Sequence, residues 1–487
     1  MSLIESEHYT DTQQKEFVSA VTTEPPVFDT KHVRPWTGTQ KFAFRAAFTY
    51  VVLMCIPFTA KYYTYIYNLN WSNLYWSDLS SIATNVSAPQ FVTIATESGR
   101  WGLASYANLA LTLLTSLVIA ALWTIIVRAK KTEREEYNEL YYWMRVLVRY
   151  RVGFAIVAWG YKKLIPMQMV FPTEGILTTS IIDMQEQKLY WQSMGFVPNY
   201  QSFLGLAEFL GGFLLLFRKT TALGAALTLV VLANIALANH AYDGGVHISS
   251  FGFAVLALII LAKDLPNIWN LLVKEKDVIP TTYYPDFSAA WKKYSRLGLK
   301  TVGLIVFVGV LLYMQWRDFH NYRLPVTPGL SGAKGHYAVT EFKLNNTPIA
   351  FSPDDSIRWQ DATFEEWSTL SFKVNRKEKM DQSNGGSIRH GLGGVHIDID
   401  RSWENASIGG GRHFFFYEVD SVHHQILLQN KNTAHREEKQ VLNYTRPSDS
   451  RIILSGRNEF NDSIYVVLDK IQKKYPLSEE HREAGVY

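Results

Sequence analysis

Seven separated apolar stretches occupy the first two thirds of the chain and constrain its fold more than any other feature. A helix needs about 20 apolar residues to cross the hydrocarbon core of a bilayer, and each stretch has that length or nearly so. We expect spanning helices at residues 43–61, 103–127, 143–165, 202–217, 221–239, 248–264 and 298–316. The mean hydropathy of the whole chain, -0.05, conceals them because a long polar tail dilutes the apolar part. The sequence therefore predicts a polytopic α-helical membrane protein.

Lysine and arginine collect in two of the connections, and cytoplasmic loops are the ones that retain these residues. The connection after the second stretch contains Arg128, Lys130, Lys131, Arg134 and Arg145, and the one after the sixth contains Lys274, Lys276, Lys292, Lys293 and Arg296. The connection from Tyr62 to Gly99 contains neither residue type. Alternating sides then puts the N-terminus in the cytoplasm and everything after Trp316 outside.

The last third of the chain has the pattern of strands rather than helices. From Gly332 onward, short runs alternate polar and apolar residues and are separated by turn residues. The predicted strands are Tyr337 to Leu344, Thr369 to Val374, Val395 to Ile399, His413 to Val419, His424 to Leu428, Arg451 to Leu454 and Ser463 to Leu468. We expect an antiparallel sandwich or barrel-like unit of about 150 residues, entirely β and exported. The Gly-rich stretches 384–394 and 408–413 are interpreted as its hairpin loops.

The predicted organisation has five parts. They are a disordered cytoplasmic tail (1–40), two N-terminal spans with an exterior aromatic loop (41–140), a membrane core (141–265), a cytoplasmic loop with the last span (266–320) and an exported β-rich domain (321–487). The loop from Tyr62 to Trp76 is crowded with aromatic rings, which favour the membrane interface. We expect it to lie along the outer surface; a binding face for a partner is the alternative.

Composition excludes some classes of function. Cys55 is the only cysteine and falls inside the first span, so the exported domain has no disulfide and no dithiol chemistry of its own. The net charge of +4 is carried mostly by predicted cytoplasmic loops, where anionic lipid headgroups are its expected counterpart. The predicted partner is therefore the lipid bilayer, with no nucleic acid.

Charged residues inside the spans are the candidates for chemistry, because a charge held in lipid costs a few kcal/mol and is seldom kept without a use. In the third span, one helix face carries Arg149, Gly153, Gly160 and Lys163. In the fourth span, one face carries Gly205, Glu208 and Gly212, whose small residues allow a close helix contact around a carboxylate. We therefore predict an ion pair between Lys163 and Glu208.

The predicted orientation brings further polar residues to the same exported side. Asn234, Asn239 and His240 lie toward the outer end of the fifth span, and Asp243 and His247 lie in the following turn. We hypothesise a vestibule lined by Asn234, His240 and His247 that opens toward the β domain. The catalytic candidates are Glu208, Lys163 and His240, and the cofactor-binding candidates are Arg149, Asn234 and His247. The alternative is structural: Lys163 snorkels to the interface, Asn239 and His240 cap a helix, and Glu208 fixes helix register.

The spacing His240-x-x-Asp243-x-x-x-His247 resembles a set of metal ligands. Gly244 and Gly245 interrupt any continuous helix there, and no fourth ligand is evident. No metal site is predicted.

Two segments of the membrane core carry a resemblance to a known family. The segment RYRVGFAIVAWGYKK (149–163) has Arg149 and Gly153 in its first part and ends with Lys163. The helix GLAEFLGG (205–212) is followed by the turn Arg218-Lys219-Thr220. This pattern, over residues 145–265, resembles the DoxX family, with a small departure in the order of the turn. The resemblance implies a four-helix membrane core related to subunits of thiosulfate:quinone oxidoreductase. The whole layout is similar to long DoxX-like proteins of Bacteroidota, which implies an inner (cytoplasmic) membrane location and a periplasmic β domain.

Two classes of function follow, and the sequence does not decide whether the protein is an enzyme. In the first, the bundle is a redox subunit that binds a quinone, and Glu208 or His240 moves the accompanying proton. In the second, the protein is a non-catalytic anchor or assembly component whose β domain binds a membrane or periplasmic partner. A remoter likeness to the vitamin K-dependent carboxylase group has no local motif behind it. A transporter is a third class, but the spans lack the internal repeat common in carriers.

Overall fold

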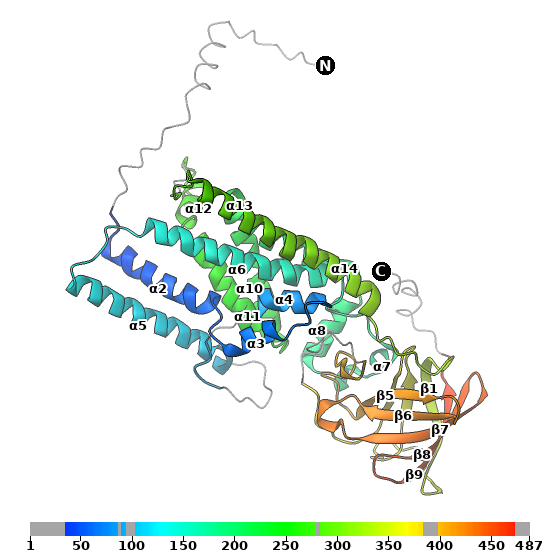
Figure 1. The fold of residues 1–487 in the computed structure, drawn as a ribbon. Coiled ribbons are helices and arrows are strands. Elements are labelled where there is room, and N and C mark those ends of the chain that lie inside the picture. The colour runs from blue at the N-terminus through cyan, green and yellow to red at the C-terminus, as the bar shows by residue number, and fades with distance from the viewer. Residues whose placement is uncertain (1–34, 86–88, 94–102, 279–282, 383–397, 473–487) are drawn as a thin grey trace, which may run out of the picture.

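The computed structural model describes residues 35–85, 89–93, 103–278, 283–382 and 398–472. A long bundle of helices carries a β-barrel at one end (Figure 1). The predicted tail of residues 1–40 lies almost entirely outside the described residues, and the chain becomes helical at Gly38.

Helices occur at all seven predicted apolar stretches. Their bounds are α2 (Gly38–Cys55) with α3 (Ala60–Tyr67), α5 (Ala107–Ala129), α6 (Asn138–Leu164), α9 (Pro198–Leu215), α10 (Thr221–Ala241), α11 (His247–Leu261) with α12 (Leu265–Leu272), and α13 (Ala290–Leu304) continued by the π-helical η4 (Ile305–Val310) and α14 (Leu311–Tyr322). Among the described residues, four helical segments are long and apolar enough to cross a membrane: Gly38–Tyr67, Leu103–Ala129, Arg218–Ala241 and Ala290–Tyr322. The pair α11 and α12 forms a fifth if it is one span, bent by 71°.

The surface of α5 shows what surrounds the bundle. Its exposed side chains include Leu113, Leu114, Leu117, Val118, Ile119, Leu122, Ile125 and Ile126. An apolar face of this length is not stable in water, and it matches the hydrocarbon core of a bilayer. The chain is a membrane protein with a separate β domain.

Glycines let α6 and α9 pack with their backbones in contact. A Cβ atom at Gly160 would lie 2.6 Å from the Phe209 nitrogen, and one at Gly205 would lie 2.1 Å from the Leu164 nitrogen. Small residues are what permit so close an approach between membrane helices. The two predicted faces, one on each helix, therefore meet each other. On its far side α9 packs against α10, which in turn packs against α11.

The helix α4 (Trp76–Thr84) begins at the last residue of the predicted aromatic loop, Tyr62 to Trp76, and packs along α6 and α14. The Trp76 ring lies 5.8 Å from Lys162 Nζ, and the guanidinium of Arg151 binds the carbonyl of Ala83. The helix α4 therefore runs beside the part of α6 that lies between Arg151 and Lys162.

The C-terminal domain is a closed antiparallel barrel, which confirms the barrel-like alternative. Its strands are β1 (Gly335–Leu344), β2 (Thr347–Pro348), β3 (Asp361–Phe364), β4 (Thr369–Lys373), β5 (Arg412–Asp420), β6 (Gln425–Asn430), β7 (Lys439–Ser448), β8 (Arg451–Arg457) and β9 (Ser463–Lys470). They follow the order β2-β1-β3-β4-β5-β6-β7-β8-β9, and the pairing of β1 with β9 closes the barrel. Alternate residues point inward and form one apolar core that includes Tyr337, Phe364 and Phe415.

Three strands were not predicted, and one prediction was wrong. The strands β2 and β3 are too short for an alternation to be recognised, and β7 is rich in polar residues. In the stretch predicted as a strand at Val395 to Ile399, the described part begins a 3₁₀ turn (Asp398–Asp400), and residues 395–397 lie outside the described residues.

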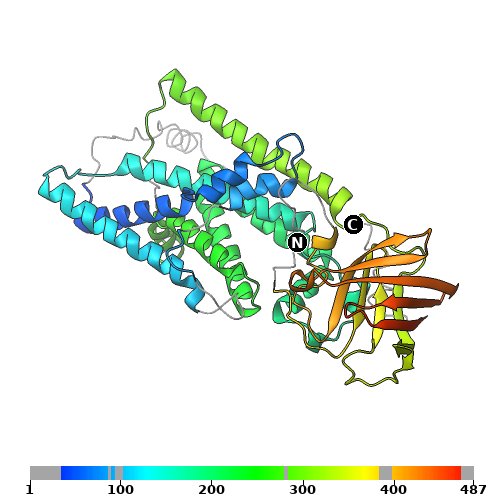
Figure 2. The ribbon, with the colours of Figure 1, turned by 60° about the horizontal axis from the view of Figure 1, so that its bottom comes forward.

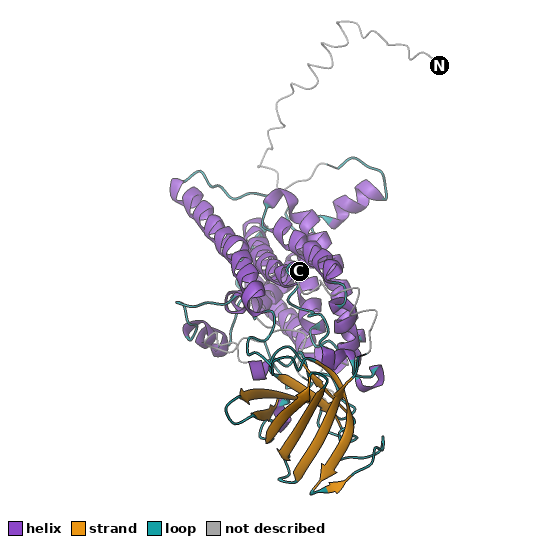
Figure 3. Ribbon diagram, turned by 90° about the vertical axis from the view of Figure 1, so that its right-hand side faces the viewer, coloured by secondary structure: helices purple, strands orange, loops and turns teal. Residues whose placement is uncertain are grey.

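The barrel docks onto the bundle by its side wall. The connection between α6 and α9 contains α7 (Glu174–Leu177) and α8 (Glu186–Gly195), and α7 packs on the outer face of β1 and β3 (Figures 2 and 3). An apolar cluster fills this contact: Met167, Ile176, Phe319, Trp403, Ile408 and Phe414. The barrel is therefore held by packing as well as by its covalent linker.

Candidate functional site

Lys163 and Glu208 form the predicted ion pair. Lys163 Nζ lies 2.7 Å from Glu208 Oε1, and the side chains are 10% and 3% exposed. The pair lies between α6 and α9, beside the close contacts at Gly160 and Gly205. Each charge offsets the free-energy cost of burying the other, so burial of either residue depends on its partner.

The short helix α8 lies close to this pair. Tyr190 of α8 stacks on Tyr242 with ring centroids 4.9 Å apart. Burial raises the pKa of the Tyr190 hydroxyl, and the neighbouring Tyr200 and the Glu208 carboxylate raise it further. The helix α8 therefore places an aromatic hydroxyl within the electrostatic reach of Glu208.

His240 and His247 meet where α10 gives way to α11. Their ring centroids are 5.6 Å apart, and the Tyr106 ring lies 6.0 Å from one and 5.5 Å from the other. His247 Nε2 lies 3.0 Å from Ser105 Oγ. The structure thus brings together these two of the predicted residues, against the segment that leads into α5.

Arg149 and Asn234 do not join either group. Arg149 is buried, and its Nε donates to the Leu215 carbonyl at the end of α9, at 3.0 Å. It lies about 21 Å from Lys163 along α6. Asn234 is exposed on the surface of α10. Of the predicted vestibule residues, His240 and His247 meet while Asn234 does not join them, and the Lys163–Glu208 pair lies at a different helix interface.

A groove of about 390 Å³ lies between α2, α4, α6 and η4. Its lining is mostly apolar and includes Cys55, Tyr62, Tyr150, Arg151 and Phe307. The Arg151 guanidinium lies 4.7 Å from the centroid of the Phe253 ring and donates a hydrogen bond to the Ala83 carbonyl. Such a groove can take an apolar chain that carries a polar head.

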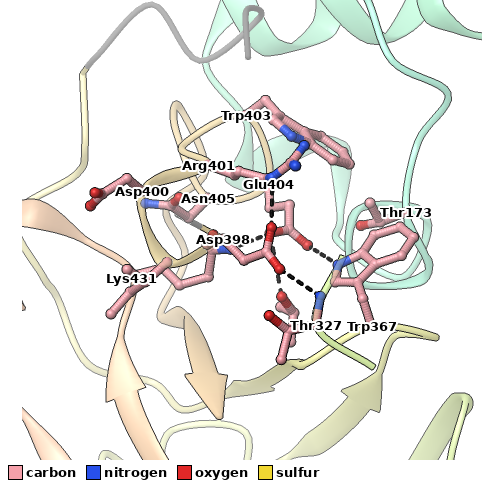
Figure 4. A network of polar contacts seen from close by, with 12 residues as sticks. Thr173, Thr327, Trp367, Asp398, Asp400, Arg401, Trp403, Glu404, Asn405 and Lys431 are labelled. Carbon is pink, nitrogen blue, oxygen red and sulfur yellow. Dashed lines mark hydrogen bonds and ion pairs between the residues drawn. The ribbon is translucent and has the colours of Figure 1, made fainter. Parts of the chain in front are cut away.

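Glu404 is the centre of a buried network between barrel and bundle (Figure 4). Its carboxylate accepts a hydrogen bond from Trp367 Nε1 at 2.7 Å and forms an ion pair with Lys431, and the Glu404 and Lys431 side chains are both 0% exposed. From the bundle side, Lys188 of α8 donates to the carbonyl of Trp403 at 2.6 Å. The network joins four segments that are far apart in the sequence.

Asp398 and Arg401 extend this network to the linker after α14. Asp398 Oδ2 accepts from the backbone nitrogens of Val326 and Thr327 at 3.0 and 2.7 Å (Figure 4). Arg401 donates to Asp398 Oδ1 and to the Tyr322 carbonyl, both at 2.9 Å. The linker after α14 is therefore fixed by side chains of the connection between β4 and β5.

Burial perturbs two ionisable groups of this junction. Desolvation lowers the pKa of Lys188 to about 7, although the Glu404 carboxylate acts in the opposite direction. Desolvation raises the pKa of Glu365 to about 8, although its carboxylate accepts from the backbone nitrogens of Gly175 and Glu174 at 2.7 and 3.1 Å. Both groups change charge near neutral pH, where exposed lysines and glutamates do not.

One group of side chains in the described part of the chain has the geometry of metal ligands. The ligand atoms of Glu378, His413 and Glu438 all lie within 4.8 Å of one another. The group lies at one mouth of the barrel, and Glu378 and His413 line a pocket of about 340 Å³ there. This group is different from the His240, Asp243 and His247 spacing that resembles metal ligands in the sequence.

Comparison with known proteins adds one relative and no function. No family model and no solved structure matches the chain. An uncharacterized protein of Bacillus subtilis (strain 168), YwoB, is 38% identical over 85 residues, which are 18% of this chain and 55% of the relative. The chain thus spans about half the length of the curated relative that it matches.

Sequence reasoning found the Lys163–Glu208 pair but missed the junction and the barrel mouth. A charge inside an apolar helix is visible in the sequence because it interrupts a pattern. Glu404 lies in a polar stretch of the sequence and His413 stands at the start of a predicted strand, so neither interrupts an apolar helix. Several charged residues between 398 and 412 are buried, but their spacing follows no helix or strand period that could have predicted their burial.

Proposed function

We propose that the protein is a membrane anchor that holds an exported β-barrel in a fixed orientation toward a partner in the cell envelope. The observation that carries this proposal is the buried network around Glu404. A flexible tether needs no buried charges at its attachment, and each one costs free energy unless it is paired. Lys188, Lys431 and Arg401 are all paired or hydrogen-bonded there, so a single docked arrangement is favoured over the alternatives.

The proposed topology has seven spans, with the N-terminus in the cytoplasm of an inner membrane and the barrel in the periplasm. The distribution of lysine and arginine supports it. So do ion pairs at the end of the bundle away from the barrel, where Arg145 lies 2.9 Å from Asp264 and Arg45 lies 3.3 Å from Glu133. In this proposal α6 and α9 cross the membrane too, and their charges are buried against each other.

The wall of the barrel away from the bundle is the proposed face for the partner. The docked wall is formed by β1, β3, β4 and β5, which leaves β6, β7 and β8 facing away. Leu427 and Val441 are directly opposed across β6 and β7, and they are 43% and 48% exposed. Such an exposed apolar pair on a β-sheet is a common element of a protein contact.

Spin labelling tests the fixed orientation. Labels at Tyr67 and Val422, which are 86% and 83% exposed, report the distance between bundle and barrel in a Cys55→Ser background. We expect one narrow distance distribution, which broadens in Lys431→Met and stays narrow in the control Lys334→Met. A broad distribution with the junction intact would contradict the proposal.

Photo-crosslinking in cells tests the partner. A crosslinking residue at Leu427 should give a discrete product with an envelope protein, and Glu404→Gln should reduce its yield. The same residue at Lys343 on β1 is the control. Equal products from both positions would show that the barrel has no preferred face.

A second candidate is a quinone-linked redox subunit with a DoxX-like core over residues 145–265. The groove beside Arg151 supports it, because the groove is mostly apolar and is bordered by a guanidinium and two tyrosines. The Lys163–Glu208 pair would supply a group for proton transfer. The chain's own sequence offers no dithiol, so electrons would come from a partner or a substrate.

Extraction of bound lipids separates the two candidates. A quinone retained by the protein in mild detergent and lost in Arg151→Met would favour the redox subunit. If Glu208→Gln also lost it, the ion pair would belong to the same site. Retention of a crosslinked partner with no quinone in any variant would favour the anchor.

A further inference from the structure

The mouth of the barrel contains a histidine, His413, whose surroundings are typical of a metal-ligating side chain rather than of a core residue. His413 is 2% exposed and points inward from β5. Its ring stacks on Phe372, with centroids 5.4 Å apart and planes 11° apart. Stacking of this kind fixes the plane of the imidazole, so its two nitrogens have set directions.

Neither nitrogen of His413 makes a hydrogen bond within the described residues. Nδ1 does lie 2.9 Å from Glu378 Oε1, but not in hydrogen-bonding geometry. A buried polar atom without a partner costs free energy, and native structures seldom retain one without a ligand or a use. A cation between the imidazole and the carboxylate would satisfy both groups.

Two carboxylates converge on this histidine. Glu378 comes from the connection after β4 and Glu438 from the residue before β7, and one oxygen of each lies within 4.8 Å of the other and of a His413 nitrogen. Like charges so close repel. Arg376 lies 3.2 Å from Glu378 and 2.9 Å from Glu459, so its one positive charge is shared between two carboxylates.

Further contacts hold the carboxylates in place. Asn430 donates to Glu438 Oε2 at 2.8 Å, and His435 Nδ1 lies 2.9 Å from Glu438 Oε1. Outer partners of this kind orient the ligands of metal sites. The pocket of about 340 Å³ beside the group leaves room for water or a small ligand on the open side.

We propose that Glu378, His413 and Glu438 bind a divalent transition-metal ion, with Zn²⁺ as the representative ion. One imidazole and two carboxylates suit ions of this class better than Ca²⁺ or Mg²⁺, which prefer oxygen ligands alone. Bonds of about 2.0–2.2 Å allow ligand atoms up to about 4.4 Å apart, so the three groups need only close slightly around the ion. Three protein ligands and an open side leave a coordination position for water or for an anionic ligand.

Zinc binding by the full-length protein tests the proposal. The protein is purified in mild detergent with a tag that contains no histidine, treated with chelator and dialysed against buffered ZnCl₂. Glu438→Gln keeps the shape of the side chain and an acceptor for Asn430, and His413→Phe keeps the stack on Phe372. The control is His423→Ala, because His423 lies 2.7 Å from Asp420 in an exposed pair that resembles a metal site only in composition.

We expect about one zinc per chain in the unmodified protein and in the control, and at least about a tenfold lower affinity in Glu438→Gln and His413→Phe. X-ray absorption of the bound zinc should show one imidazole among oxygen ligands. If His413→Phe does not fold, Glu438→Gln decides, and zinc should raise the melting temperature of the unmodified protein but not of that variant. No zinc in the unmodified protein, or equal affinity in Glu438→Gln, would overturn the proposal.

Discussion

Lys163 and Glu208 face each other across the α6–α9 interface, with Nζ 2.7 Å from Oε1, although 45 residues separate them in the chain. Their helices approach closely because Gly160 and Gly205 have no side chains to keep them apart. The pair and the glycines therefore depend on each other. The ion pair forms only because the helices pack closely. The same close packing would leave either charge buried and unpaired if the other residue were missing.

Removing one partner of the pair should destabilise the bundle strongly. Glu208→Gln leaves the Lys163 ammonium buried without a counter-charge, a change that costs about 3–5 kcal/mol. Replacing both residues, as in Lys163→Met with Glu208→Leu, should restore much of this loss. Thermal unfolding in detergent measures it, and a Glu208→Gln variant as stable as the unmodified protein would show that the pair contributes nothing to the fold.

A methyl group at Gly205 should separate α6 from α9. Its Cβ would lie 2.1 Å from the Leu164 backbone nitrogen, so the helices must move apart, and we expect Gly205→Ala to cost about 3 kcal/mol or more. The control is Gly298→Ala in α13, where no atom lies within 4 Å of the added carbon. That change should be neutral or stabilising by about 0.5–1 kcal/mol through helix propensity. Similar melting temperatures for the two variants would contradict the packing.

Breaking the junction should loosen the barrel from the bundle. Lys431→Met leaves Glu404 buried without its cation, and we expect a loss of about 3–5 kcal/mol together with faster proteolysis between residues 322 and 334. Lys334→Met removes a pair with Glu366 that is 3.2 Å long and has side chains 53% and 75% exposed. Exposed pairs contribute about 0–1 kcal/mol, so this control should change neither property. Equal proteolysis of the two variants would argue against the junction.

The stability of the junction should depend on pH through Glu365. Its pKa is about 8 in the folded protein and near 4.5 when exposed, so between these values the folded state holds a proton that the unfolded state has lost. The contribution of Glu365 to stability is therefore present below pH 4.5 and declines as the pH rises toward 8. Glu365→Gln stays neutral at every pH and removes this decline.

Melting temperatures of the protein and of Glu365→Gln at pH 5, 6, 7 and 8 measure the effect. The difference between the two should shift in favour of the variant as the pH rises. Lys188 acts in the opposite sense, because its pKa of about 7 lies below that of an exposed lysine, so its contribution recovers above pH 7. Comparing variant with parent cancels the Lys188 effect. A constant difference across this range would contradict the raised pKa of Glu365.

Several features could be predicted because they follow from local pattern. The apolar stretches gave helices at the expected places, and the faces of α6 and α9 that carry Lys163 and Glu208 do meet. The helix α4 was missed because its sequence, WSDLSSIAT, is short and only partly apolar. Its position depends on Arg151 and Asp318, which come from other helices: Arg151 binds the Ala83 carbonyl, and Asp318 Oδ2 accepts from the Trp76 nitrogen at 2.7 Å.

The sequence by itself determined that the chain has a helical membrane part and a β part, because hydrophobic period and length depend only on neighbouring residues. Only the tertiary structure decided which wall of the barrel docks, that Glu404 and Lys431 are fully buried, and that Glu378, His413 and Glu438 converge at one mouth. These groups come from separate strands and loops, and barrel closure brings them together. Their burial depends on closure of the barrel and on its docking to the bundle. A local sequence pattern cannot predict either.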